Sequence, residues 1–303
     1  MDLVELIKVA RGEEEANLLL KNTRVVNVFS GEVHEANVAI ARSRIVGLGD
    51  YRAKREIDLK GSYLCPGFID GHVHIESSMV TIPEFARAVV PKGTTSIVID
   101  PHEIANVLGL NGIRYMLESS KYNPLSVYVM LPSSVPATDM ETAGAELLWY
   151  DLSLLLNEEW VVGLGEMMNY HGVLFRDQAV LDKIRAAGGK RIDGHAPGLS
   201  GRDLAAYVAA GVHSDHECTT VEEAREKLRL GMYIMIREGT IARNLRDLLP
   251  LVTAENARRC MFVTDDPSPA DLMDEGHINY LVKMAISLGL NPITAIQMAT
   301  LNP

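Results

Sequence analysis

The pattern of hydrophobic and polar residues divides the chain into three stretches. The first, MDLVELIKVARGEEEANLLLKN, is an amphipathic segment that predicts a helix near the N-terminus. From Leu18 to Asp50, short β-branched segments alternate with polar turns such as Ser30-Gly31, which is typical of a small antiparallel sheet. Further on, apolar strands alternate with helical segments, as in parallel βα units. We therefore expect an N-terminal helix with a small β-sandwich portion over residues 1–63 and an α/β domain over residues 64–303.

The second domain has the strand and helix pattern of a (β/α)₈ TIM-like barrel. The expected strands are YLCPGFIDGHVH, TSIVID, LSVYVML, WVVGLGEM, KRIDGHA, GVHSDHE, MYIMIR and CMFVTDD. The expected helices include IPEFARAVVPKG, HEIANVLGLNGIRYMLESS, VLDKIRAAG, GRDLAAYVAAG, TVEEAREKLRLG, DLLPLVTAENARR and, as the eighth, NPITAIQMATLNP. Eight such repeats over about 240 residues match the size of this barrel. A doubly wound open sheet is the alternative.

Composition narrows the possible partners. The 303 residues carry a net charge of -11, which disfavours binding to a nucleic-acid backbone and favours a small neutral or cationic ligand. No apolar stretch is long enough to span a membrane, and the first residues lack the pattern of a secretory signal. The three cysteines, Cys65, Cys218 and Cys260, are widely spaced and give no disulfide framework. We expect a cytoplasmic protein that contacts neither nucleic acid nor membrane.

Polar side chains gather where the predicted strands end. They are His72 and His74 on the first strand, Glu166 on the fourth, His195 on the fifth, His216 on the sixth and Asp265 on the eighth. Active sites of such barrels lie at these ends. A His-x-His pair on a strand places both imidazoles on one face, where they could hold a divalent ion. A second histidine pair could hold another ion, with a carboxylate bridging the two.

Each of these residues has a simpler explanation when taken alone. The histidines could be hydrogen-bonded in the barrel mouth, and Glu166 could pair with a basic side chain. Asp265 could cap the next helix, because DDPSPADL contains capping residues and prolines. These explanations do not account for six such residues falling at predicted strand ends. The sequence therefore favours a metal site.

At this point the chain resembles the amidohydrolase superfamily and, more closely, its bacterial and archaeal adenine deaminases. The matching stretches are PGFIDGHVHIESSM, IDPHEIANVLG, VGLGEMMNY, DGHAPGLSG, SDHECTTVEEA, KLRLGMYIMIREGTIARNL and FVTDDPSPADLMDEGHINYLV. They cover most of the chain from Pro66 to Val282, and SDHECTT with REGTIARNL is far more specific than His-x-His. The opening, VARGEEEANLLLKNTRVVNVFSGE, is also similar to the start of that family.

The resemblance implies a centre of two divalent metal ions, Mn²⁺ or Fe²⁺, with Zn²⁺ possible on ligand type. Six residues would bind them: His72 and His74 one ion, His195 and His216 the other, Glu166 both as a bridge, and Asp265. The family also continues well beyond the position of Pro303 with a C-terminal domain, so we expect such a part to be missing from this chain. A homo-oligomer is expected as well.

The resemblance further implies hydrolytic deamination of adenine to hypoxanthine and ammonia, by a hydrolase acting on a non-peptide C–N bond of a cyclic amidine. Hydroxide held by the two ions would attack C6, because coordination lowers the pKa of water from about 15.7 to about 7. Asp265 would take its proton and return it toward the departing amine. Glu76, Glu103 and Glu217 are candidates for the acid that protonates ring nitrogen N1, and each could instead orient a histidine.

The segment DPHEIAN follows the second predicted strand. Its Asp100, His102 and Glu103 could line the purine pocket, bind an additional ion or cap the next helix. Ser77, Ser78 and Arg237 are further pocket candidates without an assigned role; these three also lie near predicted strand ends.

Other functions remain open at this stage. One is a different hydrolase of the superfamily, either a cyclic amidase or an N-acetyl-sugar deacetylase. Cyclic amidases of this kind usually bridge their metals with a modified lysine, and Glu166 at that position disfavours them. Another is an inactive truncated chain that serves as a binding partner. A cytidine-deaminase type of zinc enzyme is set aside, because the sequence has no P-C-x-x-C element after His74 and Glu76.

Overall fold

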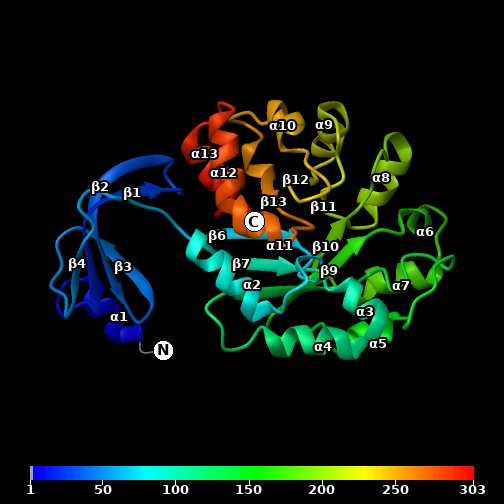
Figure 1. Ribbon diagram of the computed structural model, residues 1–303, viewed down its shortest axis with the longest axis horizontal. Helices are drawn as coiled ribbons and strands as arrows, with labels where there is room; N and C mark the ends of the chain where they lie inside the picture. The colour runs from blue at the N-terminus through cyan, green and yellow to red at the C-terminus, as the bar shows by residue number, and fades with distance from the viewer. Residues whose placement is uncertain (1–2) are drawn as a thin grey trace. The chain divides into compact units, whose positions relative to one another are not determined.

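A computed structural model describes residues 3–303 of the chain (Figure 1). These residues form two compact units, one reaching to Pro66 and the other spanning Gly67–Pro303. The first two residues of the expected N-terminal helix lie outside the described part. The division into domains at residues 63 and 64 stays a prediction.

The first unit is a helix and one mixed sheet. Its helix is α1 (Leu3–Ala10) and its strands are β1 (Leu18–Asn27), β2 (Glu32–Ala41), β3 (Arg44–Leu48), β4 (Glu56–Asp58) and β5 (Tyr63–Leu64). β1, β2 and β3 pair antiparallel, as expected, but β4 and β5 run parallel to β1. These two strands follow the stretch from Leu18 to Asp50 for which the antiparallel sheet was expected, and the chain returns after β3 to run beside β1 in the same direction. Leu6 and Val9 of α1 join Leu19 of β1 in the buried core of this unit.

Eight parallel strands form the second unit. They are β6 (Phe68–Val73), β7 (Thr94–Ile99), β8 (Ser126–Leu131), β9 (Val161–Met167), β10 (Arg191–Gly194), β11 (Ser214–Asp215), β12 (Tyr233–Arg237) and β13 (Cys260–Val263). β6 to β10 make one sheet in chain order, and β11 to β13 make a second. Backbone bonds join the two sheets, from His213 N–H to Ile192 O at one seam and from Asp265 N–H to His72 O at the other. The closed (β/α)₈ barrel is confirmed, and the open-sheet alternative is wrong.

Helices cover the barrel on the outside. In Figure 1 the strands lie at the centre of this unit, with α4 and α5 on one side and α9, α12 and α13 on the other. The α-helices are α2 (Ile82–Val89), α3 (His102–Leu108), α4 (Leu110–Ser119), α5 (Trp149–Ser153), α6 (Tyr170–Leu174), α7 (Gln178–Ala186), α8 (Gly201–Ala209), α9 (Val221–Arg229), α10 (Leu245–Leu248), α11 (Pro269–Asp274), α12 (Ile278–Ser287) and α13 (Pro292–Met298). Short 3₁₀ turns lie at η1 (Glu76–Ser78), η2 (Val90–Lys92), η3 (Leu249–Leu251) and η4 (Ala257–Arg259). None of the helices within residues 3–303 has the length and hydrophobicity that crossing a bilayer requires.

Three expected elements are interrupted by glycine or proline. The first expected barrel strand is split, because Pro66 has no N–H for a strand ladder, so β5 pairs with β1 while β6 enters the barrel. The long helix expected from HEIANVLGL ends at Gly109, whose φ of 58° is non-helical, and α4 begins after it. The helix expected from DLLPLVTAENARR is reduced to α10 and two 3₁₀ turns, because Pro250 ends the regular hydrogen bonding.

Removing the Phe85 ring is expected to destabilise the barrel. Phe85 of α2 has no exposed surface and packs edge-to-face on His277, with ring centroids 5.4 Å apart. Phe85→Ala should lower the free energy of unfolding by about 3 to 5 kcal/mol, measured by urea denaturation. Phe175→Ala is the matched control, because Phe175 is 77% exposed and its loss should change stability by less than about 0.5 kcal/mol. Equal effects of the two substitutions would contradict the packing role.

Candidate metal centre

The six residues expected as metal ligands lie together at the carboxyl ends of the barrel strands. His72 is within β6 and Glu166 within β9, whereas His74, His195 and His216 directly follow strands and Asp265 lies two residues beyond β13. His195 is half-buried and the remaining five side chains are buried. These ends meet because all eight strands run parallel around one closed barrel.

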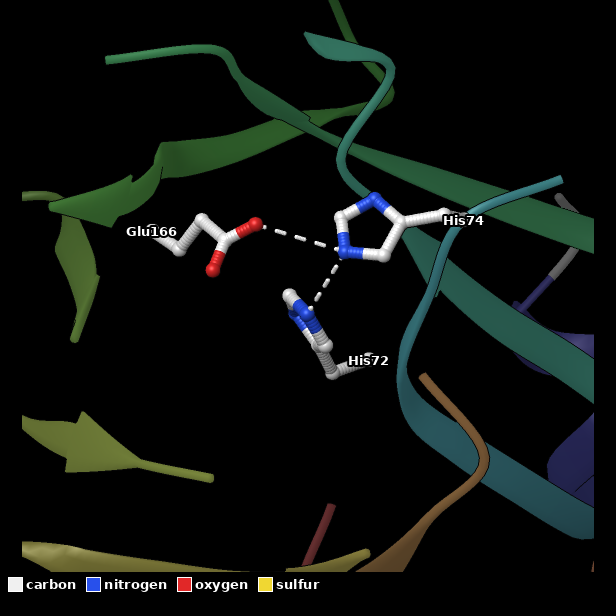
Figure 2. A group of neighbouring side chains, drawn as sticks. All are labelled: His72, His74 and Glu166. Atoms are coloured by element: carbon white, nitrogen blue, oxygen red, sulfur yellow. Dashed lines mark hydrogen bonds and ion pairs between the residues drawn. The ribbon is translucent and has the colours of Figure 1, made fainter. Parts of the chain in front are cut away.

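The first group consists of His72, His74 and two carboxylates. The Nε2 atoms of His72 and His74 are 3.1 Å apart, and His74 Nε2 lies 3.3 Å from Glu166 Oε1, as Figure 2 shows. Asp265 Oδ1 is 3.5 Å from His72 Nε2 and 3.3 Å from His74 Nε2. Four atoms that could bind a metal ion, from the ends of three strands, thus lie close together.

The second group lies on the other side of the same glutamate. Glu166 Oε2 is 2.6 Å from His195 Nδ1 and 3.2 Å from His216 Nε2, whereas Oε1 faces His74. The two carboxylate oxygens therefore point to different histidine pairs. A carboxylate that bridges two ions needs this arrangement.

Backbone bonds between β6 and β13 set the positions of the first group. Asp265 N–H donates to His72 O over 3.0 Å, and His74 N–H donates to Asp265 O over 2.8 Å. Asp265 itself has a φ of 60°, a left-handed conformation that costs energy for a residue other than glycine. The strained turn places the Asp265 carboxylate against the two histidines.

Asp100, at the end of β7, supports both His74 and Glu166. Its carbonyl lies 2.8 Å from His74 Nδ1, which leaves His74 Nε2 facing the cluster. Its Oδ2 accepts the Glu166 N–H over 2.7 Å. A Cβ atom on Gly165 would lie 2.1 Å from that oxygen, so glycine is required for the carboxylate to reach the β9 backbone.

The DPHEIAN segment lies at the cluster itself. His102 Nε2 is 3.1 Å from Glu166 Oε1, and Glu103 Oε2 is 3.5 Å from His74 Nδ1. The interpretation of this segment as a helix cap is wrong, because Pro101 occupies the N-cap of α3 and no side-chain cap bond forms there. The contact between His102 and Glu166 was not predicted from the sequence.

The residues that follow His74 along the chain lie next to the cluster. Glu76 Oε1 accepts the Ile104 N–H, and its Oε2 is buried without a hydrogen-bond partner within residues 3–303. Ser77 Oγ donates to Asp266, whereas Ser78 Oγ donates to a carbonyl of its own turn. Burial and the nearby Glu103 raise the pKa of Glu76 to about 7. A carboxyl with this pKa can hold a proton near neutral pH.

Arg237, the last residue of β12, connects the remaining carboxylates. Its Nη1 donates to Asp265 Oδ2 over 2.8 Å and also to Glu217, and its Nη2 donates to Glu217 Oε2 over 3.1 Å. Glu217 Oε1 lies 3.4 Å from His216 Nε2. In the sequence, one feature indicated that Arg237 would lie near these carboxylates: its position at the end of a predicted strand.

The charge of the cluster fits bound divalent cations. Burial opposes ionisation of Glu166 and Asp265, but hydrogen bonds with the surrounding histidines hold the pKa of each carboxyl well below its usual range. Both are therefore anionic in a buried site, where an uncompensated charge is costly. The Nδ1 atoms of His72 and His216 are buried without hydrogen-bond partners in the described part of the chain. Neutral imidazoles with anionic carboxylates are the ligand set that Mn²⁺, Fe²⁺ and Zn²⁺ accept.

Comparison with known proteins identifies the family. Residues 63–303 match the Amidohydrolase family. The chain belongs to the amidohydrolase family. The resemblance to this superfamily that the strand-end motifs suggested is thus confirmed, and the family uses divalent metal ions. Which metal the present chain binds is not fixed by this match.

Sequence relatives of this amidohydrolase point to a narrower group. It is 58% identical over 302 residues to a protein named adenine deaminase from Dehalococcoides mccartyi (strain CBDB1), with 99% of this chain and 53% of the relative covered. It is 56% identical over 298 residues to adenine deaminase 2 from Carboxydothermus hydrogenoformans, with 98% of this chain and 52% of the relative covered. The chain therefore spans about half the length of the curated relatives it matches.

Solved structures share the amidohydrolase fold at low sequence identity. The chain aligns with N-acetyl-D-glucosamine-6-phosphate deacetylase from Mycobacterium smegmatis at a TM-score of 0.65 and 16% identity, covering 95% of this chain and 89% of that one. It aligns with a D-hydantoinase at a TM-score of 0.66 and 15% identity, covering 94% and 80%. These likenesses concern the barrel fold alone.

Metal binding to this site is expected to strengthen as pH rises toward about 9. In the metal-free chain burial disfavours the charged form of His216, but its hydrogen bond to Glu166 raises its pKa to about 9. A metal ion needs the neutral ring, so below this pKa it must displace a proton. Calorimetric titration with Zn²⁺ in two buffers of different ionisation enthalpy should show proton release, and a higher affinity at about pH 8.5 than at about pH 7. An affinity independent of pH, without proton release, would count against His216 as a ligand.

Proposed function

We propose that this amidohydrolase is an adenine deaminase, which hydrolyses adenine to hypoxanthine and ammonia. The observation that carries the proposal is the 58% identity to a protein of that name across 99% of this chain, a stretch that includes every residue of the cluster. Glu166, rather than a lysine, between the two histidine pairs supports it further. The cyclic amidase alternative is weaker for the same reason.

We propose two divalent ions in the cluster, Mn²⁺ or Fe²⁺ with Zn²⁺ as the alternative. Their ligands would be His72 and His74 for one ion, His195 and His216 for the other, Glu166 as the bridge, and Asp265. Two ions bound there would lower the pKa of water and so supply a hydroxide nucleophile at neutral pH. A purine base would be held at the barrel mouth with C6 facing the cluster.

The chain's own residues would move the protons. Asp265 lies in contact with His72 and His74 and would accept the proton of the attacking water and pass it to the departing amine. Arg237 would hold the second oxygen of Asp265 in place. Glu76, Glu103 and Glu217 are the candidates for protonating N1. The pH–rate profile of the three single glutamine variants would identify the acid, because only its loss removes the fall in rate at high pH that deprotonation of the acid causes.

The direct test is a turnover assay on the purified, metal-loaded 303-residue chain. Incubation with adenine should release ammonia and hypoxanthine in equal amounts, followed by a coupled ammonia assay and by chromatography. Hydantoin and N-acetylglucosamine 6-phosphate are the comparison substrates. Turnover of either one without turnover of adenine would overturn the proposal. A chain that holds two ions but turns over none of the three substrates would support the inactive-chain alternative.

The expected homo-oligomer and the expected cytoplasmic location stay predictions. Adenine as the substrate likewise belongs to this proposal, since the relatives that bear the name are about twice as long as this chain.

A further inference from the structure

A buried lysine lies behind the second histidine pair and has no role in the proposed chemistry. The side chain of Lys227, on α9, has 0% exposed surface. Its Nζ donates to Ala196 O over 2.7 Å, to Asp215 Oδ2 over 3.0 Å and to Glu223 Oε1 over 2.8 Å. Three acceptors use all three N–H donors of the ammonium group, so its position is fully determined.

The partner carboxylate, Asp215, holds the backbone beside both histidines. Its Oδ1 accepts the Ala196 N–H over 2.8 Å, immediately after His195. Its Oδ2 accepts the Glu217 N–H over 3.0 Å, immediately after His216. One carboxylate therefore fixes the chain next to both members of the pair, and a shift of Asp215 would move them both.

Helix α9 also holds the loop that leads away from His195. Glu223 Oε1 accepts the Gly198 N–H over 2.9 Å, and Glu226 Oε1 accepts the Gly201 N–H over 2.7 Å. Together with Lys227, these side chains attach the loop over residues 196–200 and the first residue of α8 to helix α9. Ion pairs that are this deeply buried are costly to form and give little net stability. The role of the buried ion pair between Lys227 and Asp215 is better explained by the backbone geometry that it imposes beside the two histidines.

We propose that Asp215 and Lys227 are positioning residues that hold His195 and His216 at the spacing needed to bind the second divalent ion. The inference rests on the proposed two-ion centre. It predicts an asymmetry between the two ions. His72, His74 and Asp265 are set by backbone bonds at the ends of β6 and β13 and make no hydrogen bond or ion pair with Asp215 or Lys227 within the described residues, so the first ion should bind without this pair.

The test is metal stoichiometry in Asp215→Asn and Lys227→Met. The metal-stripped 303-residue chain is titrated with Zn²⁺, and bound metal is determined by elemental analysis after removal of the excess. Wild type should hold two ions. Each variant should hold one tightly, with the affinity for the other lowered by about 10 to 100-fold, as for other residues that orient ligands. Circular dichroism measures the folded fraction of each sample.

A merely structural role predicts a different result, because both ions would then be lost in proportion to unfolded protein. Lys190→Met is the matched control. Lys190 Nζ also donates to a backbone carbonyl, that of Val161, over 2.9 Å, but at the opposite end of β9, so this variant should keep two ions. If Lys227→Met does not fold, Asp215→Asn decides, since it preserves the side-chain shape.

Two further outcomes also overturn the inference, and they are distinguishable. If wild type holds two ions and both variants hold two with unchanged affinity, the positioning role fails while the two-ion centre stands. If wild type holds a single ion, the two-ion centre of the proposed function fails and the positioning role fails with it.

Discussion

Glu166→Gln is expected to lower the affinity for both metal ions by more than about 100-fold, beyond the effect typical of residues that only orient ligands. One oxygen of Glu166 faces His74 and His102, and the other faces His195 and His216. Glutamine keeps one oxygen, but its amide nitrogen carries hydrogens and cannot bind a cation. The substitution also removes the negative charge between the two positions. Adenine deamination should fall in parallel with the bound metal.

Glu159→Gln is a suitable control for this variant. Glu159 is exposed and precedes β9, the strand that carries Glu166. Its substitution should leave two ions bound and the rate unchanged. Elemental analysis and the ammonia assay are applied to both proteins, with circular dichroism as a check on folding. A Glu166→Gln chain that retains two ions and full activity would rule out the bridging role.

The barrel could be predicted from sequence because its strands are buried on both faces. Such strands appear as apolar runs, and several of the eight have that form, as in β9 and β13. β11 is different, since it has only two residues, Ser214 and Asp215, and both are polar. A strand was predicted there only because the segment lies between two predicted helices. Three predicted elements are interrupted, at Pro66, Gly109 and Pro250. Whether a proline or glycine ends a strand or helix depends on its tertiary context, so the sequence did not show where these elements would end.

The candidate site could be predicted because strand ends converge in this fold. Knowing that His72, Glu166 and Asp265 end parallel strands is enough to bring them together. The supporting residues could not be found in this way. Lys227 lies on a helix rich in charged residues, where a lysine is normally exposed. Only the packing of α9 against the loop after His195 shows that it is buried.

The contact of His102 with Glu166 was missed for a related reason. His102 begins α3 rather than ending a strand, so its direction depends on how the β7–α3 connection turns. The sequence indicated the segment but did not choose between lining a pocket, binding an ion and capping a helix. Elements of regular structure are thus easier to predict from sequence than the loops that orient their side chains.

Asp265→Asn is expected to lower kcat for adenine by about 10² to 10⁴-fold, the usual contribution of a positioned acid or base. Asparagine has nearly the same shape and keeps an oxygen toward His72 and His74, but it cannot accept a proton. Burial opposes its ionisation, yet hydrogen bonds with these histidines hold the pKa of Asp265 well below its usual range. Asp265, the proposed base, is therefore ionised throughout the neutral pH range, and the loss should be similar at every pH above about 6. Metal content should fall less than in Glu166→Gln, because the other ligands remain.

The neighbouring aspartate provides the control for this loss. Asp266 is half-buried, accepts a hydrogen bond from Ser77, and within the described residues has no ion pair with the cluster histidines and belongs to none of the potential metal-ligand groups. Asp266→Asn should keep kcat within about tenfold of wild type, far less than the change for a catalytic base. Steady-state kinetics on metal-loaded proteins separate kcat from KM. Because Asp265 is proposed to act on the proton rather than on adenine binding, its variant should change kcat and leave KM near the wild-type value. A loss confined to KM, or an equal loss in both variants, would refute the proton-transfer role.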